Sequence, residues 1–132
     1  MTAADYKSAG FAVSANLEQA KIDTAETLVT GAYLSPIIGT STLAAPTLLV
    51  EALAFLYLLR QNAFMTRSGA KLKTWQNSEV LQEWAAVSQM CTTCAYLLQD
   101  FRDMAVGVAG ANANADVTDI CKIYFKSNYF GL

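Results

Sequence analysis

Two cysteines, Cys91 and Cys94, have the Cys-x-x-Cys spacing of thiol redox centres and zinc sites, and they are the sharpest chemical signal in the chain. A structural zinc ion needs four ligands, and the sequence offers only Cys121 as a third thiol and no histidine. Both cysteines continue the apolar stripe of an expected helix near its middle, whereas a reactive thiolate is stabilised at a helix N-terminus. Small core cysteines are the favoured interpretation, and a Cys-based metal or redox protein stays open as an alternative.

Other residue types that carry catalysis are missing or unpaired in the sequence. Without histidine, the chain lacks the commonest general base and metal ligand. The acidic residues at 79 and 83 and at 100 and 103 have helical spacing, which solvated helix faces explain. No glycine-rich phosphate loop and no nucleophile with a partnering base is evident. We therefore expect no enzyme activity, no catalytic residue, no cofactor and no bound metal.

Basic residues gather in and beside the segment 63–78, which lies between two strongly apolar stretches. Four of the nine lysines and arginines and two aromatic residues fall there: Arg60, Arg67, Lys71, Lys73, Phe64 and Trp75. In a chain with a formal net charge of −2, this clustering favours a directed contact with an acidic partner surface or with nucleic acid passing close by. A solvated basic loop explains the cluster equally well.

Residues 64–67 and 71–75 alternate in character on either side of a Ser68-Gly69 turn, which predicts a small β-hairpin. Because a lone hairpin is only marginally stable, we expect this arm to lie against the bundle or against another subunit. The aromatic C-terminal tail has no following sequence to cover it and is a second expected contact. The expected inter-subunit or portal contacts are Phe64, Met65, Arg67, Lys71, Lys73, Trp75, Tyr129 and Phe130.

The remaining segments have helical periodicity and predict a mainly all-α fold. Helices are expected over 17–33, 46–62, 78–106 and about 117–125. The first should end before Pro36, because the residue preceding a proline is biased away from helical angles. The second is apolar around nearly its whole circumference, as in a helix enclosed on most sides. Residues 3–15 predict a short helix or an arm that packs on another subunit. The result is a small bundle of about four helices, with an extended arm or β-hairpin inserted between the second and third main helices.

Length and composition indicate a single domain, 1–132, that buries part of its surface in contacts with other subunits. Apolar residues make up 54% of the chain and charged residues 15%, below the roughly 25% usual for soluble domains. The apolar stretch 43–59 is broken by Pro46 and Glu51 and is shorter than the about twenty residues of a spanning helix. It predicts a core helix and no membrane contact, with a membrane-inserting hairpin as the minor alternative. The start MTAADYKSAG lacks a signal-peptide pattern, which favours synthesis in the cytoplasm.

The order of these parts resembles the small helical head-tail connector (adaptor) proteins of tailed bacteriophages, as in phages of gut Bacteroidales. The resemblance covers about residues 20–101 and is carried by AYLSPIIG (32–39), ALAFLYLLRQN (52–62) and TRSGAKLKTWQNSEV (66–80). It implies a structural virion protein without catalysis, a ring subunit that joins the portal to the tail and lines or surrounds the DNA passage. The cysteines and the aromatic tail have no counterpart in the family pattern.

The resemblance also implies the partners and the location. The expected partners are copies of the chain in a ring, portal and tail proteins, and packaged DNA through non-specific proximity. The expected location is the virion, assembled in the host cytoplasm. A helical filament coat or pilin-like subunit is the alternative within the same assembly class, since ring closure depends on the rotation between heterologous contacts.

Overall fold

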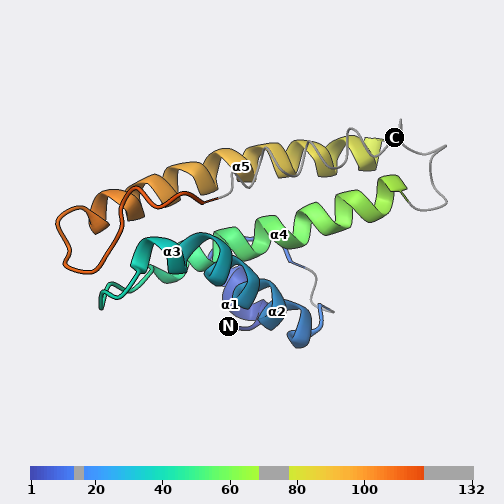
Figure 1. Ribbon diagram of the computed structural model, residues 1–132. Helices are drawn as coiled ribbons and strands as arrows, with labels where there is room; N and C mark the ends of the chain where they lie inside the picture. The colour runs from blue at the N-terminus through green and yellow to red at the C-terminus, as the bar shows by residue number, and fades with distance from the viewer. Residues whose placement is uncertain (14–16, 69–77, 118–132) are drawn as a thin grey trace.

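The computed structural model is helical throughout its regular elements (Figure 1). It describes the backbone of residues 1–13, 17–68 and 78–117, and the side chains of 1–13, 17–61 and 87–117. The elements are α1 (Ala3–Ser8), α2 (Gln19–Val29), the π-helical turn η1 (Thr30–Leu34), α3 (Ser35–Ile38), α4 (Thr47–Ser68) and α5 (Ser78–Ala105). No strand occurs in the described ranges, and the expectation of a mainly all-α fold is confirmed.

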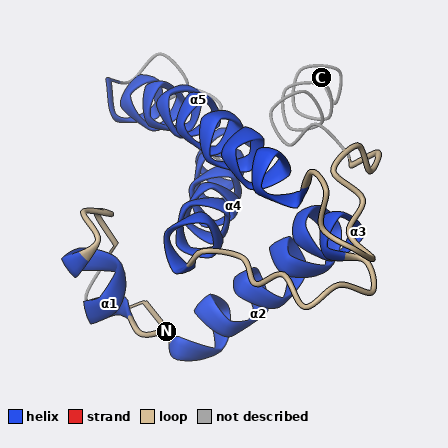
Figure 2. Ribbon diagram, turned by 90° about the vertical axis from the view of Figure 1, so that its left-hand side faces the viewer, coloured by secondary structure: helices blue, strands red, loops and turns tan. Residues whose placement is uncertain are grey.

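The middle of helix α4 is enclosed on most sides, as its apolar circumference predicts. Figure 2 shows α4 between α5 on one side and α1, α2 and α3 around the other, and contacts join α4 to both α2 and α5. Residues 51–56 are all buried, and a run of that length covers more than one complete turn of about 3.6 residues. No helix in the described part of the chain has both the length and the apolarity of a membrane span.

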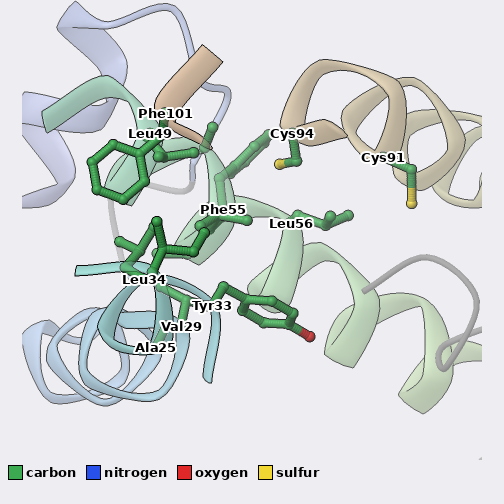
Figure 3. Close-up of a cluster of buried hydrophobic side chains, with 14 of the residues drawn as sticks. Ala25, Val29, Tyr33, Leu34, Leu49, Phe55, Leu56, Cys91, Cys94 and Phe101 are labelled. Atoms are coloured by element: carbon green, nitrogen blue, oxygen red, sulfur yellow. The ribbon is translucent and has the colours of Figure 1, made fainter. Parts of the chain in front are cut away.

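The core forms where α2, η1, α4 and α5 meet. Figure 3 shows this cluster, and its labelled members are Ala25, Val29, Tyr33, Leu34, Leu49, Phe55, Leu56, Cys91, Cys94 and Phe101. Leu34, Leu56 and Phe101 have no exposed surface at all. Burying each such side chain fully contributes roughly 1.5–3 kcal/mol relative to leaving it in water.

The first main helix does not end before Pro36, which corrects the sequence prediction. The backbone N–H of Ser35 bonds to the carbonyl of Thr30 in a π-helical turn, and Pro36 then lies in the first turn of α3. A proline is tolerated there because the N–H groups of a first turn have no helical partner. The helical path therefore continues through the proline to Ile38.

The expected arm is helical in its described part. Helix α4 continues to Ser68, so the backbone of Phe64, Met65 and Arg67 is helical, and the prediction of an extended strand there is wrong. No glycine or proline interrupts the sequence between Pro46 and Gly69, so a helix already stabilised by packing propagates to that point. The second half of the expected hairpin, which includes Lys71, Lys73 and Trp75, lies outside the described residues.

Helix α5 matches its prediction closely. It spans Ser78–Ala105, against an expected 78–106, and Val87, Cys91, Cys94 and Phe101 of the expected stripe are buried. Gly107 follows with a φ of +79°, a conformation that glycine adopts without the steric cost of a side chain. Most of the expected last helix lies outside the described residues, as do Tyr129 and Phe130.

Candidate functional site

The expected contact arm corresponds to the end of the α4–α5 pair that lies away from α1, α2 and α3 (Figure 1). Phe64, Met65 and Arg67 occupy the last turns of α4, where the backbone is described. The other expected contact residues lie outside the described residues: Lys71, Lys73, Trp75, Tyr129 and Phe130. The structure therefore places the start of the arm and leaves the joint arrangement of the eight residues as a prediction.

The two cysteines of the Cys-x-x-Cys spacing differ in state. Cys94 is a free thiol with 1% of its surface exposed, and burial raises its pKa to about 12. Cys91 is disulfide-bonded and hence not joined to Cys94, a state that the sequence did not indicate. At neutral pH a thiol with such a pKa stays protonated and is a poor nucleophile or metal ligand. The described residues contain no group of three or more histidine, cysteine or acidic side chains placed to hold a metal ion.

A polar cluster that sequence reasoning missed lies where α1 meets α2 and α4. Tyr6 has no exposed surface, and its hydroxyl donates a hydrogen bond of 2.6 Å to Oε2 of Glu26. The N-terminal ammonium of Met1 lies 3.5 Å from Oε1 of the same carboxylate. Burial, together with the hydrogen bond to Glu26, raises the pKa of the Tyr6 hydroxyl far above its usual range. Spacing within one helix gives no sign of this cluster because its members come from separate elements.

Glu51 of α4 belongs to the same cluster and is only 5% exposed. Burial raises the pKa of its carboxyl group, and the negative charges of Asp5 and Glu26 add to this effect. The ammonium of Met1 acts in the opposite direction. The one signal in the sequence was the acidic residue in the centre of an apolar stretch.

A groove of about 500 Å³ lies at the opposite end of α5 from the arm. Its lining residues are Gln99, Arg102, Asp103, Val106 and 113–117. The Nη1 atom of Arg102 donates hydrogen bonds of 2.9 and 3.0 Å to the carbonyl oxygens of Ala113 and Ala115, so this cation fastens the loop after α5. Asp103 accepts a hydrogen bond from Gln99 and is exposed, as is Asp116. The groove therefore presents acidic groups to the outside.

Large apolar side chains are exposed on several helices. Tyr96, Met104 and Val106 are 71%, 49% and 69% exposed on or just after α5, and Leu28 and Leu48 are nearly half exposed on α2 and α4. Single exposed apolar residues are normal on protein surfaces.

Comparison with known proteins finds no protein-family model, no curated protein and no solved structure that matches this chain. The membership in the connector family that the sequence suggests therefore stays a prediction.

Proposed function

We propose that this chain is a structural virion protein, a head-tail connector subunit that forms a ring between portal and tail around the DNA passage. The observation that supports this most directly is the pair α4 and α5, which extends past α1, α2 and α3 and ends at Ser68 and Ser78 (Figure 1). These two residues flank the basic segment. A projecting pair of helices is a suitable element for reaching a neighbour while the rest of the bundle forms the wall.

The two ends of this helix pair differ in charge. Residues 60–83 hold four basic and two acidic side chains, whereas 99–117 hold three acidic side chains and one basic one. That one cation, Arg102, is bonded to backbone carbonyls of its own loop. Helix α5 has 28 residues and is about 42 Å long at 1.5 Å per residue, which separates the two ends. The arm of one copy and the acidic groove of the next are therefore electrostatically complementary.

A contact between different surfaces of two copies is heterologous. Such contacts close into a ring when the rotation between copies divides a full circle, and they give an open filament otherwise. The exposed apolar side chains of α5, Tyr96 and Met104, can then contact the same neighbouring copy or portal and tail proteins. The basic arm, in a chain of net charge −2, is also the part best suited to lie near packaged DNA.

The test is the assembly state of the full chain by native mass spectrometry and negative-stain electron microscopy. We expect closed rings, and the double substitution Lys71→Glu and Lys73→Glu should abolish them. Asp100→Lys with Asp103→Lys should do the same, and combining all four changes should restore assembly because both charges are reversed. The matched control is Lys7→Glu with Lys21→Glu, two exposed cations on α1 and α2.

The outcomes separate the alternatives. Open filaments with the same charge dependence would favour the filament subunit over the ring. A monomer at high concentration, or an assembly indifferent to all of these substitutions, would refute the head-to-tail contact. Replacing Cys94 alone with alanine addresses the thiol alternative and leaves the disulfide of Cys91 in place. A metal or redox protein that uses this thiol would lose its function, while a structural subunit would still assemble.

A further inference from the structure

The cysteine content of the chain identifies the partner of the disulfide-bonded Cys91. The sequence has three cysteines, Cys91, Cys94 and Cys121. Cys94 is a free thiol while Cys91 is disulfide-bonded, and the structure is that of a single chain. Figure 3 shows the sulfur atoms of Cys91 and Cys94 apart and pointing in different directions. Elimination therefore leaves Cys121, which itself lies outside the described residues.

The loop after α5 brings the chain within reach of Cys91. Arg102 donates hydrogen bonds to the carbonyl oxygens of Ala113 and Ala115, so the chain has turned back beside α5 by this point (Figure 1). Cys91 lies about 16 Å from Arg102 along the helix, at 1.5 Å per residue. The stretch from Ala115 to Cys121 spans up to about 20 Å when extended. The length of chain is thus sufficient for a bond between Cys91 and Cys121.

We propose that Cys91 and Cys121 form a redox-dependent disulfide that fastens the C-terminal segment to α5. The two thiols are oxidised by a low-molecular-weight disulfide such as oxidised glutathione. The S–S bond between the cysteines forms, the S–S bond of glutathione breaks, and the two protons and two electrons leave with two molecules of reduced glutathione. An excess of reduced glutathione reverses the reaction.

This bond makes the state of the chain depend on its surroundings. Disulfides persist in oxidising environments and are rare in the cytosol, where thiols are kept reduced. A chain in a reducing cytoplasm therefore has a C-terminal segment without this covalent link, and a chain in an oxidising environment has the segment fastened. The disulfide is a property of the single chain and does not rest on the ring function proposed above.

Burial protects the disulfide from rearrangement in the folded chain. Cys91 is 7% exposed, so its sulfur is shielded from external thiols. Cys94 lies one helical turn away, but thiol–disulfide exchange requires a thiolate as the attacking group. Burial raises the pKa of the Cys94 thiol to about 12, so this thiol stays protonated at neutral pH. The pairing of Cys91 should therefore stay unchanged while the protein is folded.

Peptide mapping of the full chain, equilibrated with defined ratios of oxidised and reduced glutathione, tests the pairing. Free thiols are blocked with N-ethylmaleimide in denaturant at mildly acidic pH, which prevents exchange, and the chain is cleaved with trypsin without reduction. Trypsin leaves Cys91 and Cys94 on the peptide 74–102 and Cys121 on the peptide 103–122. We expect the two peptides to be linked, with the blocked thiol at Cys94. In the variant Cys94→Ala the link can come only from Cys91, and it should persist.

Thermal unfolding measures what the disulfide contributes to stability. Reduction of the wild type with dithiothreitol should lower its Tm by about 10 °C, because a bond that closes a loop of about thirty residues restricts the unfolded chain. The variant Cys121→Ser should already have the lower Tm, and reduction should not change it further. Cys94→Ala is the matched control and should keep the difference in Tm between the oxidised and the reduced chain.

Three results would overturn the proposal. The first is a map in which all three cysteines are blocked at every glutathione ratio. The second is a bond between two chains, seen as a dimer that dithiothreitol separates. The third is an effect of reduction on Tm that is as large in Cys121→Ser as in the wild type.

Discussion

Gly39 and Gly110 lie backbone against backbone, and this contact joins the loop after α3 to the loop after α5. A Cβ atom at Gly39 would overlap the carbonyl oxygen of Gly110, and one at Gly110 would lie 2.7 Å from Oγ1 of Thr40. Two hydrogen bonds fasten the contact: the amide of Thr40 donates to the carbonyl of Gly110 at 3.0 Å, and that of Asn112 donates to the carbonyl of Ile37 at 2.8 Å. The contact thereby holds the acidic groove next to α3.

Replacing either glycine with alanine should destabilise the fold. Both residues have positive φ, +59° and +86°, where a Cβ is strained, and both would also collide with neighbouring backbone or side-chain atoms. We expect a loss of about 1–3 kcal/mol in the free energy of unfolding from strain alone, and more from the collision. Urea unfolding followed by circular dichroism measures it.

Gly107→Ala provides the control for this prediction. Gly107 has a φ of +79° but nothing within 4 Å of its would-be Cβ, so only the conformational strain applies. The loss at Gly39 and Gly110 should exceed that at Gly107. Equal losses at all three positions would show that the close approach of the two loops contributes nothing to stability.

The helices could be predicted from the sequence where periodicity and capping residues agree. The bounds of α5 and its buried stripe are examples, because steps of three and four residues over a long helix leave no competing pattern. The end of α4 could not be predicted, since a short alternating stretch after residue 63 resembled a strand. Helix propagation from a packed core outweighed that local signal.

The polar cluster around Glu26 could not be predicted, because its parts meet only in three dimensions. Tyr6 stood in a stretch of small residues, and nothing in the spacing linked it to a glutamate of another helix. Glu51 was visible as an acid in an apolar stretch, but its protonation depends on neighbours from α1 and α2. The loop contact of Gly39 and Gly110 was hidden for the same reason.

The thiol of Cys94 should be inert in the folded protein and should make stability depend on pH at high pH. Burial raises its pKa from the ordinary 9.0 to about 12, so its contribution to stability is complete below pH 9 and is lost as the pH rises toward 12. A thiol-specific reagent at pH 8 should modify it only after unfolding. The variant Cys94→Ala should remove the decline in stability above pH 9 that Cys94 causes. Rapid modification of Cys94 in the native chain would contradict its burial and reopen a redox role.

Arg102 should be required for the shape of the groove at the end of α5. Its Nη1 atom donates hydrogen bonds to two carbonyl oxygens, of Ala113 and Ala115, and the shorter side chain of lysine would place its ammonium short of this position. Arg102→Lys should therefore cost about 1–3 kcal/mol in stability, as expected for hydrogen bonds to a charged group. Gln99→Ala is the control, since it removes only an exposed bond to Asp103, and it should change stability by less than about 0.5 kcal/mol. Exchange of the amides of 111–117 should rise in Arg102→Lys alone. If it stays low, contacts other than those of Arg102 hold the loop.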